Sequence, residues 1–206
     1  MFILTVDQQG STRRGDRVSE LLELLAARGL TAPAPGFVRG FERTVGDEVQ
    51  AVLDSPDRVI EVALALLREG GWSVGIGVGP DHEPLPASSR EASGPAFVHA
   101  REAVERAKSK ATAVPLAVEG EALERAAEAE AVLRLLGAVV ARRTDAGWAA
   151  VDRLARGAQT QKDVARELGI TEQAVSQRLR TAMWAEESAV HPLAARLLTE
   201  AEGTTP

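Results

Sequence analysis

Two aspartates stand where short apolar runs of the chain end or begin. Asp7 closes the run in "LTVDQQGST" (residues 4–12), and Asp47 lies in "RTVGDEVQAVL" (residues 43–53), between two apolar runs. A carboxylate pair can hold Mg²⁺, which prefers oxygen ligands and often takes one or two protein carboxylates together with phosphate oxygens. The simpler interpretation makes Asp47 a solvated turn residue and Asp7 a strand-end cap. The metal hypothesis therefore requires that folding brings the two side chains together.

Groups suited to phosphate follow Asp7 directly. The stretch "QGSTRRG" offers backbone N–H groups near a helix start, two hydroxyls and two guanidinium groups, all of which can bind a phosphate. The residues expected to do so are Gly10, Ser11, Thr12, Arg13 and Arg14. A solvated loop explains the same residues equally well.

Three alternating glycines lie further along the chain, in "WSVGIGVG" (residues 72–79). Gly75, Gly77 and Gly79 would share one face of a strand, where missing side chains permit close approach by a ligand or a helix. The spacing is not that of a dinucleotide-binding fingerprint, and no helix opens directly behind it.

The elements that position these residues alternate between strand and helix periodicity over residues 1–118. Strand patterns occupy residues 2–6, 37–45, 48–53, 72–79 and 113–118, and helix patterns occupy 14–29, 56–71 and about 93–110. This βαββαβ order with a further helix and strand predicts an α+β fold with a ferredoxin-like, palm-type sheet. In that arrangement strand 2–6 lies between strands 48–53 and 72–78. Asp7 would then sit beside Asp47.

The amino-acid composition changes at Glu119. The segment 119–143 is rich in Ala, Glu, Leu and Arg and carries no strand signal, so a long helix is expected. It would either pack on its own domain or act as a connecting or dimerisation helix between domain 1–118 and an all-α domain at 144–206.

A second kind of site is predicted within "QTQKDVARELGITEQAVSQRLRTAM" (residues 159–183). One helix would end at Gly169, which can supply the positive φ of a sharp turn, and Thr171 would cap the next. The exposed side chains could read base edges or hold phosphates, as in a helix-turn-helix. The residues expected to contact DNA are Gln161, Lys162, Thr171, Gln173, Ser176, Gln177, Arg178 and Arg180. The alternative is a plain helical hairpin inside a bundle.

The amino-acid composition bears on the cellular compartment of the protein and on its binding partners. The chain has no cysteine, which excludes disulfides and thiolate metal sites, and its apolar N-terminal run is too short for a membrane span. A cytoplasmic protein is expected. The net charge of −6 argues against indiscriminate binding to phosphate backbones. DNA binding would then need a dimer that reads two half-sites.

Four blocks resemble a known family. "VDQQGST", "VGDEVQAVL", "VGIGVG" and "GPAFVHAREAVERAK" follow one another as in class III nucleotidyl cyclase domains, and they are more similar still to the SatD family. The resemblance implies that Asp7 and Asp47 are the metal aspartates. Cyclases usually carry an Asn and an Arg on the helix after the glycine strand. Here "FVHAREA" has no Asn, and Arg101, which the resemblance implies as a further nucleotide- or phosphate-binding residue, falls one position early. Residues 159–183 resemble sigma-factor and MarR-like helix-turn-helix regions.

These observations favour a homodimeric transcriptional regulator with a degenerate cyclase-like domain that senses a nucleotide or a related phosphate ligand. Two alternatives stay open. One is an active nucleotidyl cyclase or transferase with a regulatory helix-turn-helix tail, and the other is an inert cyclase-like platform for dimerisation.

Overall fold

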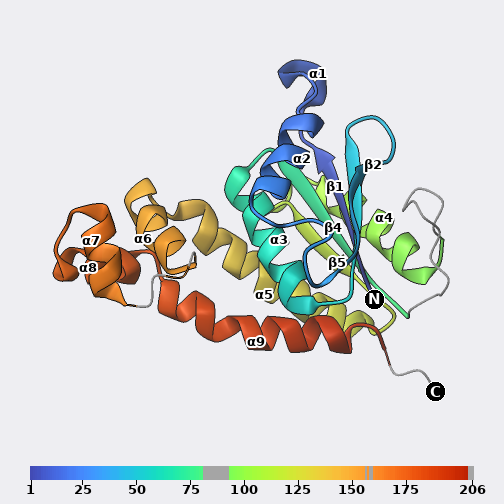
Figure 1. Cartoon of the computed structure of the whole chain (residues 1–206). Helices are drawn as coiled ribbons and strands as arrows, with labels where there is room; N and C mark the ends of the chain where they lie inside the picture. The colour runs from blue at the N-terminus through green and yellow to red at the C-terminus, as the bar shows by residue number, and fades with distance from the viewer. Residues whose placement is uncertain (81–92, 156, 158–159, 204–206) are drawn as a thin grey trace.

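A single five-stranded sheet organises the first part of the chain. The computed structural model describes residues 1–80, 93–155, 157 and 160–203. Strands β1 (Phe2–Gln8), β2 (Phe37–Arg43), β3 (Glu48–Leu53), β4 (Trp72–Val78) and β5 (Leu116–Glu119) lie in the order β2-β3-β1-β4-β5 (Figure 1). All neighbours are antiparallel except β4 and β5. The α+β prediction is confirmed, and β1 lies between β3 and β4 as expected.

One helix covers one face of the sheet at very short range. Helix α4 (Pro95–Ala107) packs on β4 and β1, and Ile3 meets Phe97 and Ala100 there. A Cβ added to Gly77 would lie 2.1 Å from the Ala96 carbonyl oxygen and 2.2 Å from the Ala100 nitrogen. The glycines of β4 therefore admit a helix backbone, which is one of the two roles predicted for them.

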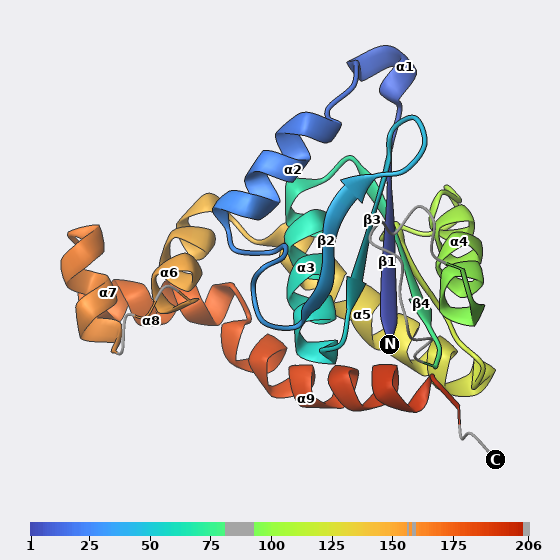
Figure 2. The same ribbon diagram turned by 45° about the vertical axis from the view of Figure 1, so that its right-hand side comes forward.

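The opposite face carries the main hydrophobic core. Alternate residues of β1 (Phe2, Leu4 and Val6) point into it, as the period of a strand requires. Helices α2 (Val18–Ala27) and α3 (Pro56–Glu69) cover this face, on the side of the sheet away from α4 (Figure 2). Helix α3 begins where the Ser55 side chain accepts a hydrogen bond from the Arg58 N–H, an N-cap directly before Pro56.

The long helix expected at 119–143 belongs to this same core. Helix α5 (Leu123–Arg142) buries Ala126, Ala129, Leu133 and Leu136 among the residues of the sheet core. Helix α9 (Trp184–Glu200) runs back along α5 and α3 (Figures 1 and 2) and adds Ala194, Leu197, Leu198 and Ala201 to the core. Hydrophobic packing thus crosses the domain boundary expected at residue 144.

The remaining helices form a smaller unit. Helices α6 (Asp145–Ala155), α7 (Gln161–Leu168) and α8 (Glu172–Thr181) project to one side of the sheet (Figure 1). Their shared core is small and includes Ala150, Val151, Val164, Val175 and Leu179. None of the helices in the described ranges is both long and apolar enough to cross a membrane.

Candidate functional site

Asp7 and Asp47 lie at the same end of neighbouring strands. Asp7 is the last residue of β1 that pairs with β3, opposite Glu48, and the Gln8 N–H donates to the Asp47 carbonyl oxygen at 3.4 Å. The sheet register therefore brings the two aspartates together, as expected from the strand order. Whether they serve as metal ligands stays a prediction.

The Asp7 carboxylate is ion-paired to a lysine. The Lys108 ammonium, just beyond the end of α4, lies 3.0 Å from Asp7 Oδ1 and 2.7 Å from Glu105 Oε1. The Asp7 side chain is only 18% exposed. Burial raises its pKa above the ordinary value, the contact with Lys108 opposes this, and the negative charges of Asp47 and Glu105 add to the rise. The carboxylate is thus partly desolvated and already has a cation beside it.

A pocket of about 510 Å³ opens beside this ion pair. Its polar lining includes Asp7, Gln9, Ser73, Lys108 and Lys110. The Gln9 amide donates to the Ser73 hydroxyl at 3.2 Å, which ties the end of β1 to the start of β4. The predicted phosphate residue Gly10, in the left-handed conformation with φ 69°, also lines the pocket.

The other predicted phosphate residues do not line this pocket. Ser11–Arg14 form the single-turn helix α1, which buries none of its side chains and stands at the edge of the molecule (Figure 1). Arg101 is exposed on α4, seven residues before Lys108, which is about 10 Å along a helix axis. The structure therefore places Asp7 and Gly10 in the pocket lining and Asp47 near Asp7. The residues that do not line the pocket are Asp47, Ser11, Thr12, Arg13, Arg14 and Arg101.

Lys108 and Lys110 are the residues that sequence reasoning missed. They lie in "AKSKATA", after the predicted helix, where a pair of lysines resembles any solvated helix end. Only the packing of α4 along β4 carries Lys108 to Asp7. Their position directly after a helix that packs on β4 is the one sequence feature that places them near the end of β1.

These contacts bear on the expected Mg²⁺ site. Within residues 1–80, 93–155, 157 and 160–203, no group of three or more acidic, histidine or cysteine side chains is arranged to hold a metal ion. The donor set is the Asp7 and Asp47 pair, and a divalent cation would have to displace the Lys108 ammonium from Asp7. Two carboxylates are within the number that Mg²⁺ commonly takes, but the ion pair with Lys108 already occupies one of them.

The second candidate site is the pair of helices α7 and α8. The Thr160 side chain caps α7, Gly169 ends it in the left-handed conformation with φ 65°, and the Thr171 hydroxyl accepts from the Ala174 N–H at 3.1 Å to cap α8. These features confirm the expected turn at 169–171. These caps pair backbone N–H groups that would otherwise lack hydrogen-bond partners at the helix ends. Each cap therefore stabilises its helix.

Exposure separates the predicted DNA-contacting residues. Gln161, Lys162, Thr171, Gln173, Gln177 and Arg180 are exposed, whereas Ser176 and Arg178 are half-buried. Gln173, Gln177 and Arg180 follow one another at spacings of four and three, so they form one stripe along α8. Val175 and Leu179 face the small core instead. The pair thus presents a continuous polar stripe to solvent.

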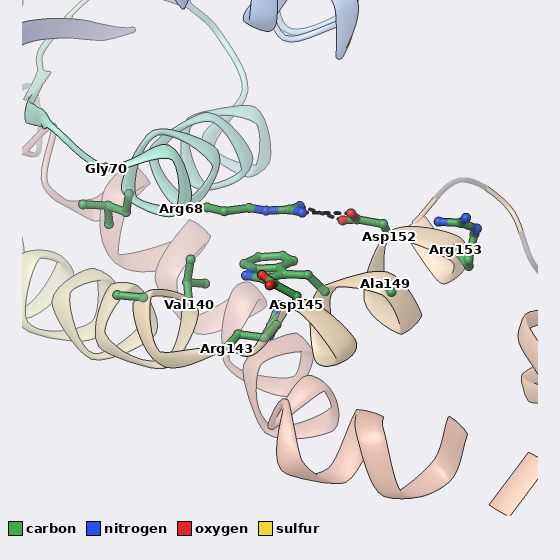
Figure 3. A pocket seen from close by; sticks show the side chains of 11 residues that line it. Arg68, Gly70, Val140, Arg143, Asp145, Ala149, Asp152 and Arg153 are labelled. Carbon is green, nitrogen blue, oxygen red and sulfur yellow. Dashed lines mark hydrogen bonds and ion pairs between the residues drawn. The ribbon is translucent and has the colours of Figure 1, made fainter. Parts of the chain in front are cut away.

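Charged side chains join this small unit to helix α3 and the end of α5, and Figure 3 shows Arg68 of α3 directed toward Asp152 of α6. The Arg68 guanidinium of α3 donates to both carboxylate oxygens of Asp152 in α6, at 2.6 and 2.9 Å. The Trp148 ring has Arg68 at 3.7 Å and Arg143 at 4.3 Å from its centre. We call Arg68, Arg143, Trp148, Asp152 and Glu187 the Trp148 junction. A cavity of about 680 Å³ lies beside it.

Arg143 links this junction to the end of α8. Its side chain is fully buried, donates to the Ala182 carbonyl oxygen at 2.9 Å and forms an ion pair with the buried Glu187. Burial alone would raise the pKa of Glu187, but bonds from His191 and Arg143 outweigh it, so the pKa lies below its ordinary value. These partners could not be expected from the sequence, because they come from α6, the end of α8 and α9.

Comparisons with protein-family models, with curated proteins and with solved structures give no match to this chain.

Proposed function

We propose that the protein is a DNA-binding transcriptional regulator in which α7 and α8 form a helix-turn-helix. The observation that carries the proposal is the capped α7–α8 pair, with Gly169 at the turn and a polar stripe of Gln173, Gln177 and Arg180 along α8. In such a motif the second helix lies in the major groove. Gln can bond adenine and Arg can bond guanine through two atoms each, which reads base identity.

Three of the remaining predicted contacts suit the DNA backbone, whereas Ser176 and Arg178 are half-buried. Gln161, Lys162 and Thr171 lie at the beginnings of α7 and α8, and helix N-termini and their side chains commonly bind phosphates. Acidic residues such as Asp163 and Glu167 offset part of the positive charge here. One copy should therefore bind weakly, and we propose a homodimer that engages two half-sites about 34 Å apart.

The experiment is selection of double-stranded DNA from a random pool by the full chain, followed by anisotropy titration at fixed salt. Gln177→Ala and Arg180→Ala should each weaken binding to the selected site roughly 5- to 100-fold, because a good bidentate base contact is worth about 1–3 kcal/mol. Arg196→Ala is the control, since that side chain is 66% exposed on α9, outside the α7–α8 pair. If the pool shows no enrichment, or if both variants match the control, the proposal fails.

We further propose that the sheet unit is a ferredoxin-like, cyclase-related domain that binds a nucleotide or a related phosphate ligand. Its support is the pocket beside Asp7, with Lys108, Lys110 and Gly10 in its lining. A ligand can alter DNA binding only if it prefers one arrangement of the two units to another. The Trp148 junction is the contact through which such a preference would act. DNA titrations with and without added nucleotide test this, and unchanged affinity would remove the sensing role while leaving DNA binding intact.

A catalytic role has less support. Arg101 lies outside the pocket, and Asp7 is held by Lys108, so positive charge is not arranged around a metal-bound triphosphate as phosphoryl chemistry requires. Incubation with ATP or GTP checks this, and a cyclic product that disappears on Asp7→Ala would establish the enzyme instead.

A further inference from the structure

The Lys108 ammonium takes a position beside Asp7 that a divalent cation would otherwise need. Its nitrogen lies 3.0 Å from Asp7 Oδ1, at the distance of a charge-assisted hydrogen bond. Asp7 is largely buried and Lys108 is 34% exposed on the pocket side. The carboxylate is therefore neutralised from within the chain.

We propose that the pocket beside Asp7 binds a phosphate-bearing ligand without a divalent cation, with the Lys108 ammonium in place of the metal ion. The inference rests on the proposed ligand-binding function of the sheet unit and specifies its chemistry.

The charges of the lining support this assignment. Among the lining residues, Asp7 contributes one negative charge and Lys108 and Lys110 contribute one positive charge each. Glu105 and Asp47 add negative charge just outside the lining. An ammonium has three N–H donors, and Asp7 and Glu105 accept two from Lys108. The third is left for a phosphate oxygen, with Lys110 as a second donor. In a metal site, by contrast, a divalent cation would bind both the phosphate oxygen and the Asp7 carboxylate.

The size of the pocket suits such a ligand. Small-molecule sites typically enclose about 300–1,000 Å³, and this pocket measures about 510 Å³. Its other polar side chains are uncharged, namely the amides of Gln8 and Gln9 and the hydroxyls of Ser73, Ser109 and Thr112. They can orient a sugar or a base without adding negative charge.

The first experiment measures the binding of Mn²⁺, a probe for Mg²⁺, to the full chain. The paramagnetic signal of the unbound ion reports how much Mn²⁺ remains free. Wild type should hold no Mn²⁺ at concentrations up to about 1 mM, the range of weak protein carboxylate sites. Lys108→Met should bind at least tenfold tighter than wild type, and Lys108→Met with Asp7→Asn should lose that gain. Equal Mn²⁺ affinity in wild type and Lys108→Met, abolished by Asp7→Asn, would overturn the inference.

The second experiment titrates pyrophosphate by calorimetry, in EDTA and then in Mg²⁺. Binding should occur in EDTA, should not tighten with Mg²⁺, and should fall at least fivefold in both Lys108→Met and Lys110→Met. Arg142→Met, which removes an exposed charge from the end of α5, should bind as wild type does. Thermal melting of each variant confirms that it is folded.

The outcomes separate the two proposals. Binding that requires Mg²⁺ overturns the metal-free inference and leaves the proposed ligand-binding role standing. No binding under either condition overturns both. DNA binding is measured on the same samples and is independent of either result.

Discussion

The α7–α8 pair and the Asp7 pocket are assembled in opposite ways. Helices α7 and α8 come from one continuous stretch of chain, and each is started and stopped by its own caps. The Asp7 pocket draws on residues 7–10, 73 and 107–115, which only the sheet and α4 bring together. A local signal therefore specifies the first site, whereas the second depends on the register of β1 with its neighbours. The Trp148 junction is where the two regions meet, and its loss should have the largest effect.

Removing Arg143 should break the connection between the two regions. Arg143→Met leaves the Glu187 carboxylate buried without its counterion, and such a loss typically costs about 3–5 kcal/mol of the free energy of unfolding. Urea unfolding followed by tryptophan fluorescence measures it, since Trp148 and Trp184 lie beside the junction. Arg142→Met, one residue earlier and exposed, is the matched control. Equal midpoints for the two variants would show that the buried ion pair contributes nothing.

A methyl group on β4 should disturb the sheet region alone. In Gly77→Ala the new Cβ meets backbone atoms of α4 at 2.1 and 2.2 Å, so α4 must shift, at a typical cost of about 1–3 kcal/mol. Because Lys108 follows α4, pyrophosphate binding should weaken while DNA affinity is kept. Calorimetry and anisotropy on the same sample decide this. A variant that loses DNA affinity and keeps pyrophosphate binding would contradict the separation of the two regions.

In the α7–α8 pair, the corresponding Gly→Ala substitution at Gly169 acts through backbone conformation. In Gly169→Ala no atom lies within 4 Å of the added Cβ, but the residue keeps a φ of +65°, which costs a non-glycine residue about 1–2 kcal/mol. DNA affinity should fall and pyrophosphate binding should not. Gly169→Asn is a useful companion, since Asn tolerates this conformation better and should recover part of the loss.

Acid should weaken the Trp148 junction. The folded-state pKa of Glu187 is lowered, so its stabilising contribution is complete above the unfolded pKa of about 4.3 and is lost as the pH falls through the folded value. Urea midpoints measured from pH 6 to pH 3.5 should therefore fall more steeply for wild type than for Glu187→Gln. If the urea midpoints of wild type and Glu187→Gln change in parallel with pH, then the pKa of Glu187 is the same in the folded and unfolded states, which contradicts this prediction.

The fold was largely predictable because its signals are periodic and local. The alternation in β1, the N-cap before α3 and the glycine that ends α7 each act within a few residues. The position of β1 between β3 and β4 followed from the order of elements alone. The packing of α5 could not be predicted in the same way. An amphipathic helix rich in Ala and Leu can pack in the core of its own domain or against another domain or chain. Only the packing of Leu133 and Leu136 in the sheet core identifies its neighbour.

The candidate site was predictable only in part. The pairing of Asp7 with the region of Asp47 could be derived from sheet topology. The Lys108 contact could not, because it depends on how far α4 slides along β4, and the glycines that permit the close approach do not specify that offset. Arg13, Arg14 and Arg101 have the right chemistry for phosphate, but they project from elements that place them outside the pocket.

The sequence by itself determined most strands and helices and the capped turn at Gly169, because these depend on side-chain periodicity and on backbone preferences within a few residues. The order of the elements along the chain also predicted that β1 lies between β3 and β4. Tertiary structure alone decided that a lysine neutralises Asp7, that α9 returns to the sheet core, and that Arg68 and Arg143 enclose Trp148. The physical reason is that ion pairs and cation–π contacts act over a few ångströms in space, at any separation along the chain.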